Sequence, residues 1–121
     1  QHYPDRVAAP IRHAAAAAGS PWLPLGSAWD AASRPDGIHY RDARGEMVLP
    51  RPRLAGTHQR HNALLAIAML RHQDRLEVPE AALRAAMGWA EWPARLQRLG
   101  PGPLLNRLPE GAELWLDGGH N

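Results

Sequence analysis

Side chains suited to nucleotide recognition occur in three short segments of this 121-residue sequence. Residues 56–62 read Gly-Thr-His-Gln-Arg-His-Asn, residues 92–97 read Trp-Pro-Ala-Arg-Leu-Gln, and residues 116–121 read Leu-Asp-Gly-Gly-His-Asn. Amide, guanidinium and carboxylate groups are natural partners of an adenine ring, a phosphate and ribose hydroxyls. Together the three segments predict parts of a nucleotide site.

The first segment opens a predicted helix over about residues 58–72. We expect the Thr57 hydroxyl to cap this helix, and His58, Gln59 and Asn62 fall within its first turn and a half. An asparagine amide matches the N6 donor and N7 acceptor of adenine, so Asn62 would suit adenine recognition if it faces a cleft. The alternative is that these polar side chains only satisfy the free N–H groups at the helix start.

The second and third segments carry an arginine and a carboxylate. The planar fork of Arg95 suits a pair of phosphate oxygens, and the alternative is an ordinary solvated arginine on a loop. Asp117 follows a predicted strand at residues 113–116, where a carboxylate commonly accepts from ribose hydroxyls. Its alternative is a glycine-rich turn closed by the aspartate side chain.

His58 and His61 form an H-x-x-H pair, which is half of a possible metal site on one helix face. A metal would need further ligands, and the sequence contains no cysteine and no H-E-x-x-H motif. We therefore predict no metal site in this chain.

Several elements must position these segments. A helix over about residues 10–18, with Pro10 in its first turn, should end at Gly19. The helix after residue 57 is apolar on every side from Ala63 to Leu70, which is typical of a helix buried in a layered domain. An amphipathic helix is predicted from Pro79 to Met87 and should end at Gly88, with Leu83, Ala86 and Met87 on one face.

The remaining elements are expected to be short. Ile38–Arg41 and Met47–Leu49 should pair across the turn at residues 43–45. Residues 26–36 are rich in turn-forming residues, and residues 89–99 resemble an extended linker. Further strands are predicted at 22–25, 104–105 and 113–116, and we expect the last strand to expose an unpaired edge.

Composition narrows the class of protein. The hydrophobic content of 45% and charged content of 21% are ordinary for a globular domain. All 14 basic residues are arginines, so this segment supplies no lysine chemistry, and their scatter argues against nucleic acid binding. No apolar run approaches the length of a membrane span and no signal pattern is present, so we expect a cytoplasmic protein without membrane association.

In their order and spacing, the three segments resemble the nucleotide-contacting segments of the folylpolyglutamate synthase/dihydrofolate synthase family, a branch of the Mur ligases. The family has H-Q-x-x-N, W-P-G-R-x-Q and D-G-A-H-N where this chain has the sequences above. Two departures are Ala94 and Gly119, which replace a glycine and an alanine. If the family glycine needs a positive φ, Ala94 would strain the turn and displace Arg95.

The resemblance implies a function for each segment. Asn62 would contact the adenine of ATP, Asp117 the ribose, and Arg95 the phosphates from the linker between two domains. His120 would lie at the interdomain cleft, near the phosphates or the incoming glutamate, together with His58 and Gln59. None of these residues is nominated as a catalytic acid or base, because their work would be positioning and electrostatic stabilisation.

The implied fold is α/β. Residues 1–88 would be the end of a central Mur-ligase-like ATP-binding domain, 89–99 the interdomain linker, and 100–121 the truncated start of a C-terminal Rossmann-like domain. The implied reaction is amide ligation, in which ATP phosphorylates a carboxylate of dihydropteroate or folate and L-glutamate attacks the acyl phosphate. The parent enzyme would act with Mg²⁺ and be a monomer.

The resemblance implies two lysines, one in the family's P-loop and one that is carbamylated and helps to hold the metal. This chain contains no lysine. We therefore expect an internal fragment that is inactive alone, with the metal ligands outside it. Two other interpretations stay open: a Mur-type ligase with a different amino acid substrate, and a non-catalytic globular interaction module.

Overall fold

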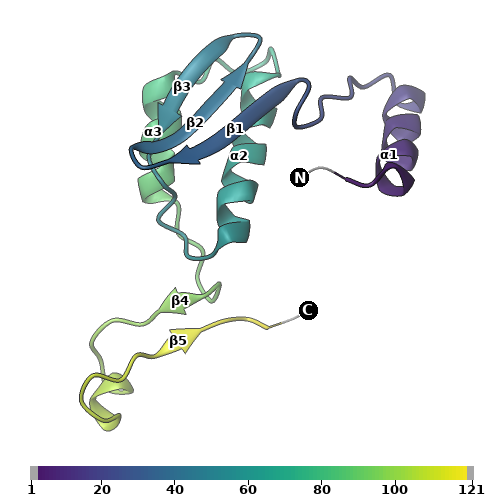
Figure 1. Ribbon diagram of the computed structural model, residues 1–121. Coiled ribbons are helices and arrows are strands. Elements are labelled where there is room, and N and C mark those ends of the chain that lie inside the picture. Colours follow the sequence, from purple (N-terminus) through teal and green to yellow (C-terminus); the bar gives the residue numbers. More distant parts are fainter. Residues whose placement is uncertain (1–2, 120–121) are drawn as a thin grey trace.

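The computed structural model describes residues 3–119 (Figure 1). A helix stands at the N-terminal end, a three-stranded sheet backed by two helices forms the main body, and a small hairpin follows. The helices are α1 (Asp5–Ala17), α2 (Thr57–Arg71), α3 (Glu80–Trp89) and a short 3₁₀ turn (Leu105–Arg107). The strands are β1 (Trp29–Arg34), β2 (Gly37–Asp42), β3 (Gly45–Leu49), β4 (Gln97–Arg98) and β5 (Trp115–Leu116). No helix in this described part is long and apolar enough to cross a bilayer.

The main sheet is an antiparallel meander in the order β1-β2-β3. The predicted pairing of residues 38–41 with 47–49 is confirmed, with Ile38 opposite Leu49 and Tyr40 opposite Met47. β1 was missed, because its polar and small residues hide the alternation within a turn-rich stretch. The strand predicted at 22–25 is wrong, since only Leu25 makes an isolated bridge, to Trp29.

Helices α2 and α3 cover one face of the sheet (Figure 1). The buried core lies between these layers and comprises Trp29, Ile38, Tyr40, Met47, Leu49, Leu64, Ile67, Ala68, Leu83 and Met87. Two predictions about the helices are wrong. Leu65 is 51% and Met69 67% exposed, because α2 packs only one face on the sheet. Ala86 is also exposed, while Leu83 and Met87 alone anchor α3.

A buried ion pair ties α2 to the far end of β2. The Arg71 guanidinium donates from Nε and one terminal nitrogen to the Asp42 carboxylate, at 2.6 Å each. The Asp42 side chain is fully buried and also accepts from the Arg44 backbone N–H at 2.9 Å. The hydrogen bonds between the two side chains shift both pKa values. The pKa of Asp42 is lowered below its ordinary value, chiefly by its bonds with Arg71, and the pKa of Arg71 is raised, chiefly by its bonds with Asp42. The Arg71 guanidinium also lies 5.6 Å from the ring centre of Tyr40.

Helix α1 begins earlier than predicted, at Asp5, so Pro10 lies inside it and not in its first turn. An acidic residue in the first turn favours the earlier start through the helix dipole. The predicted end at Gly19 is confirmed. Gly19 has φ +64° and donates to the Ala16 carbonyl, while Ser20 donates to that of Ala15, which is the Schellman arrangement.

Beyond α3 the chain forms a loop and a small hairpin (Figure 1). α3 continues through Trp89, one residue past its predicted end at Gly88, and β4 interrupts the predicted linker. The strand predicted at 104–105 is wrong, because residues 105–107 form the 3₁₀ turn. β5 lies within the predicted strand at 113–116 and pairs with β4, with Gln97 opposite Leu116 and Arg98 opposite Trp115. In this two-stranded sheet the other edge of β5 has no strand partner among the described residues, as expected.

Candidate nucleotide-binding site

The segment at residues 56–62 forms the first turns of α2, at the end of that helix nearest the hairpin (Figure 1). The predicted cap by Thr57 is wrong. The capping residue is Gly56, with φ +102°, and no side chain bonds to the helix start. The His58 ring folds back over this glycine, so a methyl group at Gly56 would lie 2.6 Å from the His58 Cε1 atom. The start of α2 therefore has no side-chain cap, and the His58 ring lies against the Gly56 backbone.

The polar residues of this segment have different surroundings. Gln59 is buried at 3% exposure, and its Oε1 atom accepts from the Asn62 amide at 3.3 Å. Asn62 and His58 are exposed. Asn62 therefore keeps its amide oxygen and its second N–H available, because the bond to Gln59 uses only one of its donors.

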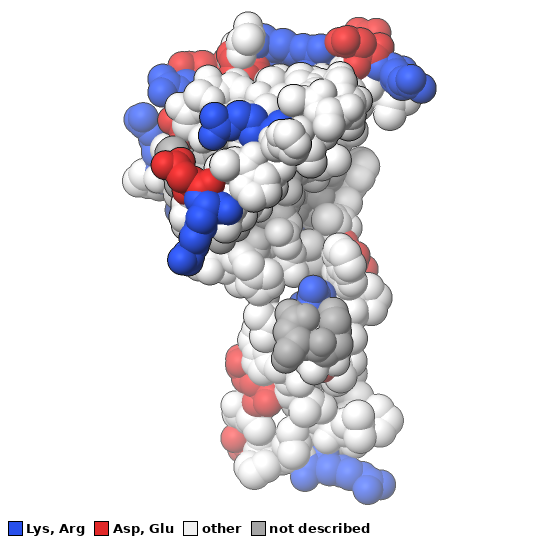
Figure 2. All heavy atoms as spheres, turned by 90° about the vertical axis from the view of Figure 1, so that its right-hand side faces the viewer, with Lys and Arg blue, Asp and Glu red and all other residues white. Residues whose placement is uncertain are grey.

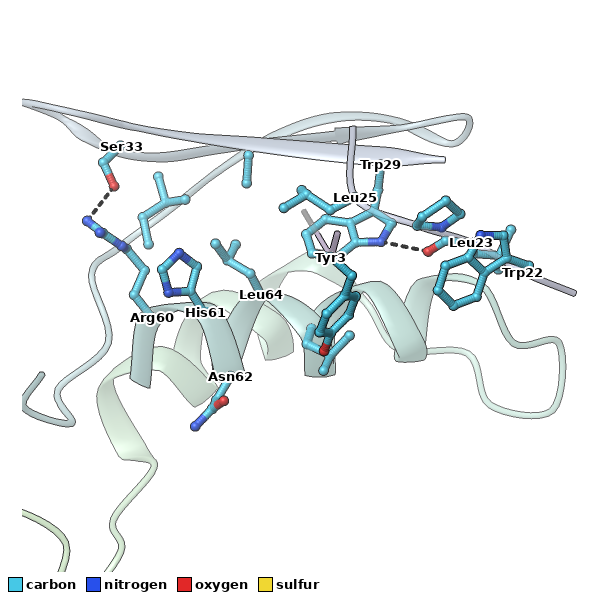
Figure 3. A pocket seen from close by; sticks show the side chains of 14 residues that line it. Tyr3, Trp22, Leu23, Leu25, Trp29, Ser33, Arg60, His61, Asn62 and Leu64 are labelled. Atoms are coloured by element: carbon cyan, nitrogen blue, oxygen red, sulfur yellow. Dashed lines mark hydrogen bonds between the residues drawn. The ribbon is translucent and has the colours of Figure 1, made fainter. Parts of the chain in front are cut away.

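Residues 60–62 contribute to a cavity of about 410 Å³ between α2, β1 and the segment before β1 (Figure 3). Its walls include Tyr3, Trp22 and Trp29. Arg60 reaches the Ser33 hydroxyl at 2.8 Å and closes one end. Asn62 contributes to the lining but points away from Arg60 and His61. The cavity is thus mainly aromatic and apolar, with Asn62 at its edge.

Arg95 lies in a second cavity of about 310 Å³, formed by residues 53–55, the loop after α3, and the hairpin. Three arginines line it. Arg53 pairs with Glu91 at 2.6 Å and Arg98 with Glu113 at 2.7 Å. Arg95 forms no ion pair or hydrogen bond with any residue in the range 3–119, so its charge is available to a ligand.

The second and third segments meet directly. The Asp117 carboxylate accepts from the backbone N–H of Leu96 at 2.9 Å and from that of Gly119 at 2.8 Å. The Gly118 N–H donates to the Ala94 carbonyl at 2.7 Å. Asp117 therefore closes its own glycine-containing turn, as expected if it has a structural role there. It also holds the loop around Arg95 through the Leu96 N–H.

The structure joins these two segments more closely than it joins either to the first. Asn62 and Arg95 line different cavities, although the start of α2, the loop after α3 and the end of β5 face one another at the same junction in Figure 1. His120, predicted at the interdomain cleft, lies outside the described residues.

Ala94 adopts φ +56°, so the departure from the family glycine falls at a left-handed residue. An alanine there is strained, as the sequence suggested. Sequence reasoning did not single out Gln97, whose Oε1 atom accepts from the Ala94 N–H at 3.0 Å. Its place at the end of the Trp92–Gln97 segment was the available signal.

Charge on the surface is mixed. On the face in Figure 2, arginine and acidic side chains are interspersed over the upper part, and the lower part carries acidic side chains as well as an arginine at the far end. Among the described residues on this face, basic side chains do not merge into a broad patch of the kind that binds a phosphate backbone.

No protein-family model and no curated protein matches the chain. Solved structures do match. Escherichia coli FolC in complex with ADP is 27% identical with a TM-score of 0.72, over 99% of this chain and 25% of that one. A bifunctional folylpolyglutamate synthase/dihydrofolate synthase with Mn, AMPPNP and L-glutamate bound is 26% identical with a TM-score of 0.69, over 92% of this chain and 24% of that one.

Folylpolyglutamate synthetase from Lactobacillus casei is also similar, at 26% identity and a TM-score of 0.69, over 98% of this chain and 30% of that one. This chain thus spans 24–30% of the length of these solved chains. The similarity to part of these structures confirms the predicted α/β class and Mur-ligase-like architecture. In fold, and at 26–27% sequence identity over nearly its whole length, the chain is similar to solved structures of the folylpolyglutamate synthase/dihydrofolate synthase family.

Proposed function

We propose that this chain supplies the adenine, ribose and linker side of the ATP site in a ligase that adds L-glutamate to dihydropteroate or folate. The observation that carries the proposal is Arg95, whose guanidinium has no partner among residues 3–119 and lines a cavity whose other two arginines form ion pairs. An unpaired cation suits an anionic ligand, and the backbone on either side of Arg95 is fixed by hydrogen bonds of Ala94 and Leu96. The ADP and AMPPNP bound to related structures support a nucleotide as that ligand.

Within this proposal each residue positions a part of the substrate. Asn62 contacts the adenine with the polar atoms that Gln59 leaves available. Asp117 contacts the ribose, because a carboxylate has about four acceptor positions and can bond both backbone N–H groups and hydroxyls. His58 and Gln59 shape the start of α2, and His120 is proposed to lie near the incoming glutamate. Arg95 stabilises charge on the transferred phosphate.

The domain assignment also remains a proposal. Residues 1–88 would form the last part of the central ATP-binding domain, 89–99 the linker, and 100–121 the start of the C-terminal domain. An arginine delivered from a linker can couple nucleotide binding to domain closure, which shields the acyl phosphate from water.

Magnesium accompanies ATP in this proposal, as Mn accompanies AMPPNP in one relative. Across residues 3–119 no three His, Cys, Asp or Glu side chains come together as a metal-binding group. We assign none of these residues to the metal, and the roles above do not depend on it.

A titration of the 121-residue chain tests the proposal. We expect ATP to bind weakly and more tightly than GTP, and Arg95→Ala to lower the affinity for ATP about tenfold, as expected for loss of a charge-assisted hydrogen bond. Arg98→Ala is the matched control, because Arg98 lines the same cavity but is paired with Glu113. Calorimetry or NMR shift changes would give the affinities.

Asn62→Ala should remove the preference for ATP over GTP and leave tripolyphosphate binding unchanged. Equal affinities of wild-type chain, Arg95→Ala and Arg98→Ala for ATP would overturn the assignment of Arg95. We expect no ADP formation by the chain alone when folate and L-glutamate are supplied.

A further inference from the structure

Arg95 stands between two residues with left-handed backbone. Ala94 has φ +56° and Leu96 has φ +44°, and they are the only non-glycine residues with positive φ in the described part of the chain. Each such residue costs about 1–2 kcal/mol relative to ordinary backbone. With one such residue on each side of Arg95, the chain bends at residues 94–96. This arginine bend therefore needs specific interactions to hold it.

Three hydrogen bonds hold this bend, and each involves a different part of it. The Gln97 side chain accepts from the Ala94 N–H at 3.0 Å. The Asp117 carboxylate accepts from the Leu96 N–H at 2.9 Å, and the Gly118 N–H donates to the Ala94 carbonyl at 2.7 Å. The backbone polar groups around Arg95 are thus bonded to one nearby side chain and to one turn about twenty residues later.

The pairing of β4 with β5 brings these partners into reach. Gln97 opposes Leu116 in the ladder, which places Asp117 beside Leu96 at the end of the hairpin. The Leu99 N–H to Leu114 carbonyl bond of 2.8 Å continues the pairing on the other side. Formation of the hairpin and formation of the arginine bend therefore depend on each other.

We propose that Gln97 and Asp117 are positioning residues that lock the left-handed bend at residues 94–96. They thereby direct the Arg95 guanidinium into the cavity between residues 53–55, the loop after α3 and the hairpin, toward a polyphosphate. The identity of that anion rests on the proposed function above, whereas the lock rests only on the backbone geometry. Asp117 has two tasks in this view, since it holds the arginine loop as well as facing the ribose.

Amide hydrogen exchange of the 121-residue chain tests the lock. Gln97→Met removes the acceptor, and we expect exchange at the Ala94 and Leu96 amides to rise about fivefold or more, the equivalent of one hydrogen bond. Gln97→Glu keeps an acceptor oxygen at the same place and should restore protection. Arg98→Met, at the neighbouring strand position, is the matched control and should leave both amides unchanged.

Asp117 is tested in the same way. Asp117→Ala should raise exchange at Leu96 and also at Ala94, because the two bonds support one bend. Asp117→Asn keeps a single acceptor oxygen, so one of the two N–H groups at Leu96 and Gly119 should stay protected. Unchanged exchange at Ala94 and Leu96 in both Gln97→Met and Asp117→Ala would overturn the lock.

A second measurement separates the lock from the nucleotide assignment. Tripolyphosphate should shift the Arg95 Nε resonance of the wild-type chain, and Gln97→Met should weaken that binding about fivefold without changing the affinity for adenosine. Altered exchange without any response of Arg95 to tripolyphosphate would support the lock and count against the proposed function. An equal tripolyphosphate affinity for Gln97→Met and wild type would overturn the directing role.

Discussion

The sheet-and-helix body at residues 29–89 and the loop with its hairpin at residues 90–119 are held together in different ways. The body has a buried core and the enclosed Asp42–Arg71 pair. The loop and hairpin have two-residue strands and no buried residue, so hydrogen bonds that the Gln97 and Asp117 side chains accept from backbone N–H groups take the place of packing. Two of the proposed binding residues, Arg95 and Asp117, lie in the less packed region, where a ligand can still adjust the backbone, whereas Asn62 belongs to the body.

The sharpest test of this difference is Asp42→Asn. It leaves the Arg71 guanidinium without its carboxylate, and breaking such a pair should lower the free energy of unfolding of the body by about 3 kcal/mol. Urea unfolding followed by circular dichroism measures this. Asp74→Asn is the control, because Asp74 is 93% exposed in its pair with Arg44 and should change stability by less than about 1 kcal/mol. Similar losses of unfolding free energy in the two variants would show that the buried Asp42–Arg71 pair contributes no more to stability than the exposed Asp74–Arg44 pair.

Acid should act on the body through the same carboxylate. The pKa of Asp42 is lowered in the folded chain, chiefly by hydrogen bonding from Arg71, so its contribution to stability is complete above the ordinary aspartate pKa of about 4. That contribution is lost as the pH falls through the lower, folded-state pKa. Thermal melts between neutral and acidic pH should therefore fall more steeply for wild type than for Asp42→Asn. Parallel curves would contradict this linkage.

Gly56→Ala tests the junction between the two regions. The φ of +102° and the His58 ring both oppose a methyl group, and we expect a loss of about 2 kcal/mol. The double variant Gly56→Ala/His58→Ala removes the ring contact and should recover part of the loss, leaving the backbone cost. Thermal denaturation reports both. No recovery in the double variant would mean that His58 does not press on this glycine.

The smallest effect is expected in the loop itself. Ala94→Gly relieves left-handed strain but frees the unfolded chain, so stability should stay within about 1 kcal/mol of wild type, without a clear loss. Ala86→Gly, at an exposed position inside α3, should instead destabilise by about 1 kcal/mol. Comparing the two by urea unfolding checks the sign. Equal losses would show that Ala94 is not strained.

Most of the body, and the end of α1 outside it, could be predicted from the sequence because their signals are local. Apolar alternation around a tight turn identified β2 and β3, and Gly19 marked the end of α1. β1 carries no such alternation and becomes a strand only because β2 offers it a ladder. The burial of α2 was overestimated, since composition records how apolar a helix is and not which face meets a partner.

The candidate site was only partly predictable. Asn62, Arg95 and Asp117 were proposed from residue chemistry and motif order, and their roles stay predictions, but the contacts that they make could not be predicted. The bond from the Leu96 N–H to Asp117 joins residues 21 apart, and no local pattern encodes it. The Asp42–Arg71 pair was missed for the same reason, because 29 residues separate an ordinary strand aspartate from an ordinary helix arginine.

The hairpin is closed at its base by the Leu99–Leu114 bond and by the pairing of β4 with β5. What lies between, residues 100–113, makes no hydrogen bond to the arginine bend in the described structure. Doubling the length of a flexible loop costs only about 0.6 kcal/mol of closure entropy. This stretch can therefore accept inserted residues or a grafted peptide, and homologous chains can vary in length here while the geometry around Arg95 stays the same.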